Sequence, residues 1–213
     1  MNTDDLIDFL ATRVEPVDPH RQDRQALAAL LMSFAAATAA VIVALGLRAD
    51  LMEAMVSAGF AMKIGFLVTL VAIALWGLRK GARAGAADPV PLGLLCVPLV
   101  LLWMLGALEL ARLPLASWRA TVLFYEWPVC LLSIPLLSAL PLVALTLVVR
   151  EGAPTHLRYC GALTGLCAGG LGALAYAAYC LNDTPVYVGV WYVAGIAAVT
   201  AFGWLMGPRM LRW

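Results

Sequence analysis

Six long stretches of apolar residues, separated by short polar segments, make up the chain after its first 25 residues. Lys63 is the single charged residue inside any of them. Each is close to the ~20 residues that an α-helix needs to cross the core of a bilayer, where backbone polar groups must bond within the segment. The pattern therefore predicts six transmembrane helices, at residues 26–47, 58–78, 90–108, 127–149, 159–180 and 186–206.

Composition supports the same fold class. The 213 residues are 63% hydrophobic and 13% charged, with a mean hydropathy of +0.92, whereas soluble domains carry about 25% charged residues. We expect an all-α protein with two parts, a polar arm at residues 1–25 and a six-helix membrane domain at residues 26–213. The net charge of +1 gives no support for direct nucleic-acid binding, and the polar arm has no apolar core of the kind that a cleavable signal peptide needs.

The basic residues predict the orientation. Most of the 14 lie in the arm, the second and fourth loops and the C-terminal tail, while Arg48, Arg112 and Arg119 lie in the other loops. Because loops on the cytoplasmic side carry the excess of Lys and Arg, both termini are expected in the cytoplasm.

The first residues of the arm are predicted to form a short amphipathic helix. Thr3 can cap it, Asp4 and Asp5 suit the positive end of its dipole, and apolar side chains follow helical spacing. A helix this short is marginal alone, so it is expected either to order on a basic, apolar partner or to remain a solvated tail. The residues predicted to bind a partner are Thr3, Asp4, Asp5, Leu6, Ile7, Phe9 and Leu10.

A polar turn, residues 181–185, separates the last two spans, and Asn182, Asp183 and Pro185 are typical turn residues. Tyr179 and Tyr187, which flank it, are rings of the kind that lie at headgroup depth. Cys180 is therefore expected beside water at the outer surface.

The cysteines suggest a second outer thiol. Cys130 lies 20 residues before Arg150, a helical distance of roughly 30 Å, and so shares the outer boundary with Cys180. The two are either a reactive or metal-binding pair or independent packing residues. No Cys-x-x-Cys occurs, and both histidines lie on the cytoplasmic side, so further zinc ligands are lacking and a metal stays open. Cys96, Cys160 and Cys167 are expected to be packing residues, and no cofactor is predicted.

Lys63 is predicted in the outer part of the bilayer, either snorkelling outward or paired with an acid at that depth. The candidate acids are Glu53, Glu109 and Glu126.

Two helices carry distinctive patterns. Small residues recur every four positions on the fifth span, which favours close packing of a neighbouring helix: Gly161, Gly165, Gly169, Ala173 and Ala177. The fourth span contains Pro128, Pro135 and Pro141, which should kink it.

Together these features resemble one family. Thr3-Asp4-Asp5-Leu6-Ile7, the six spans, Trp127-Pro128-x-Cys130 with Ile134-Pro135, and Cys180-x-Asn182-Asp183-x-Pro185 are similar to the NrsF-type anti-sigma factors of bacterial inner membranes. The resemblance implies that the cytoplasmic arm sequesters an extracytoplasmic-function sigma factor. It also implies that Cys130 and Cys180 match two periplasmic cysteines that sense oxidative or metal stress, and that the protein is not an enzyme.

The function we predict is that of a membrane anti-sigma factor which releases its sigma factor when the cysteine pair reacts. One alternative is a small permease using Lys63 and the kinked fourth span. Another is a membrane thiol oxidoreductase, which the missing Cys-x-x-Cys disfavours.

Overall fold

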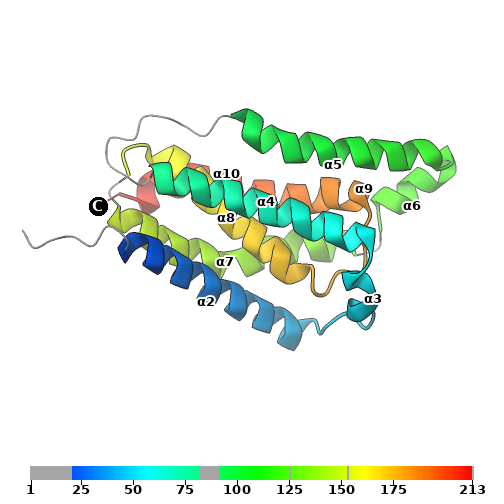
Figure 1. The fold of residues 1–213 in the computed structure, drawn as a ribbon, viewed down its shortest axis with the longest axis horizontal. Coiled ribbons are helices and arrows are strands. Elements are labelled where there is room, and N and C mark those ends of the chain that lie inside the picture. Colours follow the sequence, from blue (N-terminus) through cyan, green and yellow to red (C-terminus); the bar gives the residue numbers. More distant parts are fainter. Residues whose placement is uncertain (1–20, 82–91, 125, 153, 213) are drawn as a thin grey trace, which may run out of the picture.

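The computed structural model describes residues 21–81, 92–124, 126–152 and 154–212, which fold as a helical bundle with no strand among them (Figure 1). Six segments are long and apolar enough to cross a membrane, so the predicted all-α class is confirmed, and the number of suitable helices equals the number of predicted spans. Five are single helices: α2 (Arg21–Ala44), α4 (Ala58–Gly81), α5 (Leu92–Arg112), α7 (Trp127–Glu151) and α8 (Leu157–Tyr176). The sixth is formed by α9 (Pro185–Tyr187), the π-helical segment η2 (Val188–Tyr192) and α10 (Val193–Met210). Short helices connect them: α3 (Leu51–Met55), η1 (Leu115–Ser117) and α6 (Trp118–Val122).

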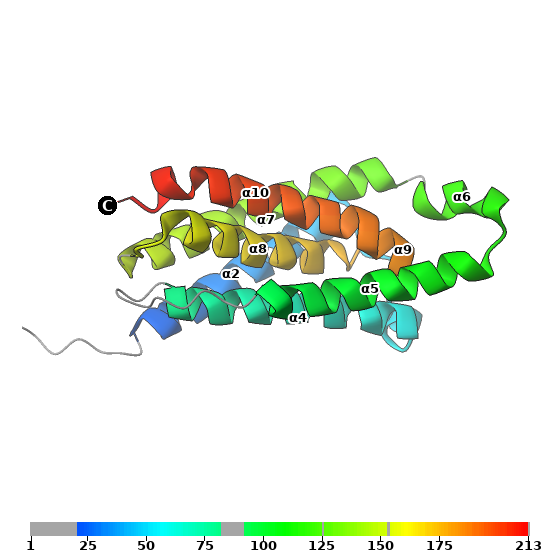
Figure 2. The ribbon, with the colours of Figure 1, turned by 90° about the horizontal axis from the view of Figure 1, so that it is seen from above.

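Helix α8 lies at the centre of the bundle, where it packs against α10, α7, α4 and α2 (Figure 2). In its most apolar 18-residue stretch 78% of the residues are buried, against 17% for α2 and for α5. The small-residue stripe explains this position, because a Cβ atom on Gly161 would lie 2.3 Å from the carbonyl oxygen of Gly203. Gly165 and Gly169 meet α10 at Val199 and Ile196 in the same way. The predicted close packing of this stripe is confirmed.

The outside of the bundle is apolar. Large side chains such as Val97, Trp103, Leu132, Leu136 and Phe202 are exposed. A soluble monomer rarely exposes apolar patches on this scale, whereas a membrane helix presents such a surface to acyl chains.

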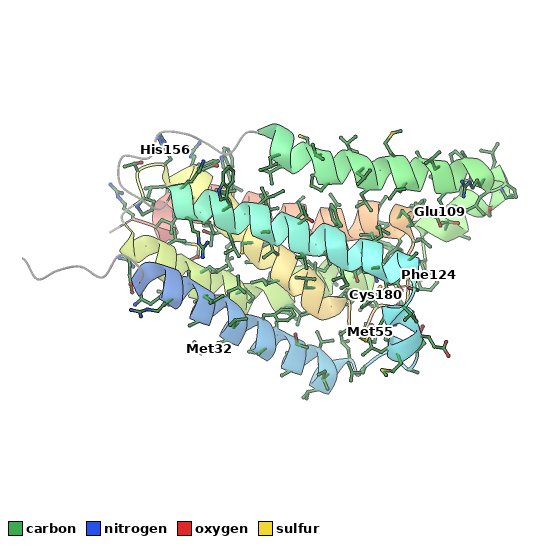
Figure 3. All side chains as sticks on the ribbon, in the orientation of Figure 1. Met32, Met55, Glu109, Phe124, His156 and Cys180 are labelled. Atoms are coloured by element: carbon green, nitrogen blue, oxygen red, sulfur yellow. The ribbon has the colours of Figure 1, made fainter. Side chains whose placement is uncertain are left out.

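The bundle has two distinct ends (Figure 1). The start of α2 and the end of α10 lie at one of them, and Cys180 lies with Met55 and Phe124 at the other, the Cys180 end (Figure 3). The last turns of α4, α7 and α10, which reach the first of these ends, carry Arg79 and Lys80, Arg150, and Arg209.

Helix boundaries differ from the predicted spans. The predicted span ended at residue 108 because the charged Glu109 ends the apolar run. Helix α5 continues to Arg112, since Glu109 and the residues after it favour a helix. Helix α8 ends at Tyr176, so Cys180 lies in the turn beyond it. Helix α7 is continuous through Pro135 and Pro141, and Pro128 lies in its first turn, where a missing N–H group leaves no bond unmade.

Candidate functional site

The turn between α8 and α9 closes on itself through side-chain hydrogen bonds. The Asn182 Oδ1 atom accepts hydrogen bonds from the backbone N–H of Thr184 at 3.0 Å and from its hydroxyl at 2.8 Å. The Thr184 hydroxyl oxygen in turn accepts from the backbone N–H of Tyr187 at 3.4 Å and caps α9. The predicted turn chemistry of Asn182 is confirmed, and it fixes the backbone that follows Cys180.

Cys130 and Cys180 lie together in one core cluster at the Cys180 end, close enough to interact electrostatically. Both are free thiols with no exposed surface, and the Cys180 sulfur lies 3.7 Å from the carbonyl oxygen of Asn182. The expectation that Cys180 lies beside water is therefore wrong. Polar turn residues suggested exposure, but Arg48 and Lys63 bind the Cys180 carbonyl oxygen and Asp183, and Cys180 lies against the core.

Three tyrosines surround the two sulfurs. Tyr176, Tyr187 and Tyr192 are fully buried, and their hydroxyls make no close hydrogen bond within the described part of the chain. The Tyr187 hydroxyl lies beside the Cys130 sulfur and the Tyr192 hydroxyl beside the Cys180 sulfur, and thiols are weak acceptors. Tyr187 is thus part of the core rather than a surface ring as predicted. Tyr179, which is half-buried, packs on Tyr176 with ring centroids 5.8 Å apart.

Lys63 is fully buried on α4 and forms an ion pair with Asp183. Its Nζ atom lies 3.5 Å from the carbonyl oxygen of Cys180 and 5.2 Å from the ring centroid of Tyr192. The turn reaches Lys63 because Gly59, four residues earlier, has no side chain: a Cβ atom there would lie 3.0 Å from the Asp183 carbonyl oxygen. The expectation that Lys63 pairs with an acid is therefore confirmed, but the acid is Asp183, so the candidates Glu53, Glu109 and Glu126 are wrong, and so is the alternative that Lys63 snorkels outward.

Arg48, in the segment after α2, completes a balanced set of two cations and two carboxylates. Its guanidinium binds both carboxylate oxygens of Asp50 at 2.9 Å. It also donates to Asp183 and to the carbonyl oxygen of Cys180, each at 3.0 Å. Arg48 is only 7% exposed, so these bonds are shielded from water. Its hydrogen bonds hold the pKa of the Asp50 carboxyl group below the ordinary value.

We call Arg48, Asp50, Lys63 and Asp183 the charge network. The sequence presented Arg48 as an ordinary loop cation and Asp183 as a turn residue, and nothing local linked either to Lys63. A sequence feature that could have indicated the pair is a lysine inside an apolar span together with an acidic residue in a loop at the same end of the bundle.

Two of the three acids that were candidates for pairing with Lys63 lie in other surroundings. Glu126 is 7% exposed, precedes α7, and leaves one carboxylate oxygen unpaired near Cys130. Glu109, on α5, accepts a hydrogen bond from the backbone N–H of Val186 at 3.4 Å and so ties α5 to α9.

The remaining cysteines lie elsewhere. Cys160 and Cys167 are buried on α8 and Cys96 is exposed on α5, which agrees with packing roles for the first two. Within the described residues no group of three or more His, Cys, Asp or Glu side chains is placed to hold a metal ion. The predicted partner-binding residues of the arm, Thr3 to Leu10, lie outside the described residues.

Comparison with known proteins covers the whole chain. The family described as NrsF, negative regulator of sigma F, matches residues 10–213. The probable anti-sigma-F factor NrsF of Azospira oryzae is 33% identical over 218 residues, which cover 100% of both chains. The anti-sigma-F factor NrsF of Caulobacter vibrioides is 28% identical over 233 residues, again covering 100% of both. No solved structure matches this chain.

Proposed function

The chain belongs to the NrsF family of negative regulators of sigma F, and from that premise we propose how it holds and releases its partner. It is an anti-sigma factor and not an enzyme. Our proposal is that it lies in a bacterial inner membrane and sequesters an extracytoplasmic-function sigma factor through residues 1–25. Chemistry at Cys130 and Cys180 on the periplasmic side then weakens this grip.

Two observations support the proposed membrane position and orientation. Six helices have the length and apolar character of membrane spans. The last turns of α4, α7 and α10 are basic, which favours the cytoplasm for the end of the bundle where α2 begins. The Cys180 end then faces the periplasm, a compartment in which disulfides form and persist.

The observation that carries the sensing proposal is the burial of Cys130 and Cys180 in one cluster at that end. Two thiols in one cluster can react together. Oxidation to a disulfide passes two electrons and two protons to an external two-electron oxidant, and a thiophilic metal ion binds both sulfurs with loss of their protons. Either reaction changes the packing of the tyrosines around the sulfurs, and hence of α7 against the α8–α9 turn.

The arm is the proposed binding element. Its acidic, amphipathic pattern suits a basic, apolar groove on the sigma factor, and a short helix that orders only on its partner is easily released. Release then needs only a modest change in affinity, because tenfold weaker binding corresponds to about 1.4 kcal/mol.

Two variants test the proposal in cells that carry the cognate sigma factor and a reporter of its target promoter. A chain lacking residues 2–15 should leave the reporter fully active without any stimulus. The double variant Cys130→Ser/Cys180→Ser should repress normally but fail to respond to diamide, a thiol oxidant, or to zinc chloride. Full repression by the shortened chain would remove the arm from the proposal, and a normal response of the double variant would remove the thiols. Cys96→Ser, on the exposed face of α5, is the matched control.

A further inference from the structure

Helix α2 connects the arm directly to the bundle, and it is held loosely along its length. Its packing partners are α7 and α8, and only 17% of its most apolar stretch is buried. An open pocket of about 270 Å³ lies beside its contact with α7, lined on α2 by small residues that include Ala36, Ala37 and Ala40. Little packing free energy therefore opposes a shift of α2 against α7.

The far end of α2, in contrast, is fastened. The chain reverses at Gly46, whose φ of +87° suits glycine, and brings Arg48 back onto the turn after α8. The backbone N–H of Arg48 donates to the carbonyl oxygen of Ala178 at 3.2 Å. Its guanidinium donates to the carbonyl oxygen of Cys180 and to Asp183, each at 3.0 Å.

These bonds join α2 to the residue that carries the reactive sulfur. A reaction that draws the Cys180 sulfur toward Cys130 moves the Cys180 backbone, whose carbonyl oxygen is the acceptor of Arg48. Because the guanidinium is buried, separating it from the Cys180 carbonyl oxygen and from Asp183 breaks two shielded hydrogen bonds and leaves it with Asp50 alone, which is unfavourable. The segment after α2 is therefore expected to move with Cys180, with the hydrogen bonds of Arg48 kept intact.

We propose that Arg48 is the positioning residue that transmits the state of the Cys130–Cys180 pair to α2, and through α2 to the N-terminal arm. This inference rests on the proposed function. Lys63 has a different part: it anchors Asp183 to α4, whereas Arg48 is the link to the helix that continues into the arm. Asp50 lies on the exposed side of Arg48, with 44% of its side chain exposed, and it is not part of the link.

The test uses the full-length chain with Arg48→Met, which keeps an unbranched side chain but removes the guanidinium group and its hydrogen bonds. The reporter is read with and without diamide, and the state of the cysteines is measured in the same cells by alkylation and mass spectrometry. We expect the thiols to react as in the parent chain while the ratio of induced to uninduced reporter falls to about one. Asp50→Asn, the matched control, should keep the parent ratio, and Arg119→Met controls for loss of a positive charge at the same end.

A second variant covers the case in which Arg48→Met does not accumulate in the membrane. Two glycines inserted between Leu45 and Gly46 leave every contact of Arg48 available but separate it from α2, and this chain should also lose induction. A parent-like ratio in either folded variant overturns the inference. If Cys130→Ser/Cys180→Ser also responds normally, the proposed sensing function fails as well; if that variant is silent, only the role of Arg48 is lost.

Discussion

Lys63 and Asp183 form a buried ion pair that joins the beginning of α4 to the turn between α8 and α9. The lysine lies on α4 and has no exposed surface, while the Asp183 side chain is 15% exposed and also binds Arg48. This pair explains how a lysine is tolerated within an apolar span: a carboxylate from a distant segment neutralises it. It also leaves Lys63 occupied by a structural contact, which gives the permease alternative no support.

Replacing Lys63 should destabilise the bundle strongly. Lys63→Met leaves Asp183 with Arg48 alone, so the loss in unfolding free energy should fall near the lower end of the about 3–5 kcal/mol typical for breaking a buried pair. The measurement is equilibrium unfolding in detergent. Lys80→Met, an exposed lysine on the same helix that packs on Trp76, should cost less than about 1 kcal/mol.

The double variant Lys63→Met/Asp183→Asn separates charge from packing. Removing the negative charge as well leaves no uncompensated carboxylate, so part of the lost stability should return. Equal losses in the single and double variants would show that Lys63 stabilises α4 through its methylene groups and not through Asp183.

The burial of Cys130 and Cys180 predicts how fast their thiols react. In single-cysteine chains in detergent, N-ethylmaleimide should modify Cys96 on the exposed face of α5 quickly. It should modify Cys130 and Cys180 at least about tenfold more slowly, because reaction requires opening of the Cys180 end. All should react at similar rates after denaturation. Rapid labelling of native Cys180 would contradict the buried position described above.

Asp50 predicts a pH dependence of stability. Arg48 holds the pKa of its carboxyl group below the ordinary 3.8. The ionised group therefore contributes stability above that value, and the contribution is lost as the pH falls through the lower pKa of the folded state. The melting temperature of Asp50→Asn should lie below that of the parent at pH 7 and approach it at pH 3. A gap that widens on acidification would show that the pKa shift has the opposite sign.

The sequence predicts the helices and part of their packing, and residue types explain why. Apolar runs identified six spans, and the four-residue repeat beginning at Gly161 identified the face that meets α10. Asn182 allowed the turn to be predicted, because its side chain bonds to residues close to it in the sequence. The charge network could not be predicted from the sequence, because Lys63 and Asp183 come into contact only when α4 packs against the α8–α9 turn.

Cys180 shows the limit of local reading most clearly. The residues after it are polar, which is typical of exposed turns, and so exposure was the natural prediction. The buried position depends on Arg48, from the segment after α2, and Lys63, from α4, which bind both Asp183 and the Cys180 carbonyl oxygen. The contacts of Asp183 and of the Cys180 carbonyl oxygen with these two cations thus hold Cys180 in the interior of the protein, although polar residues follow it in the sequence.

The contact between α8 and α10 offers a test of helix packing in which intrinsic helix preference cancels. Gly161→Ala and Gly65→Ala make the same chemical change inside a helix, and each gains up to about 1 kcal/mol of helix propensity. The new Cβ atom at Gly161 would lie 2.3 Å from the Gly203 carbonyl oxygen, whereas nothing lies within 4 Å of one at Gly65. Because backbone atoms at the α8–α10 contact cannot turn aside as a flexible side chain can, the helices must separate, at a cost of about 1–3 kcal/mol. Unfolding in detergent should therefore show Gly161→Ala as less stable than the parent and Gly65→Ala as equal or more stable. The same sign for both would mean that α8 and α10 do not approach each other through their glycines, and the central position of α8 would lose its explanation.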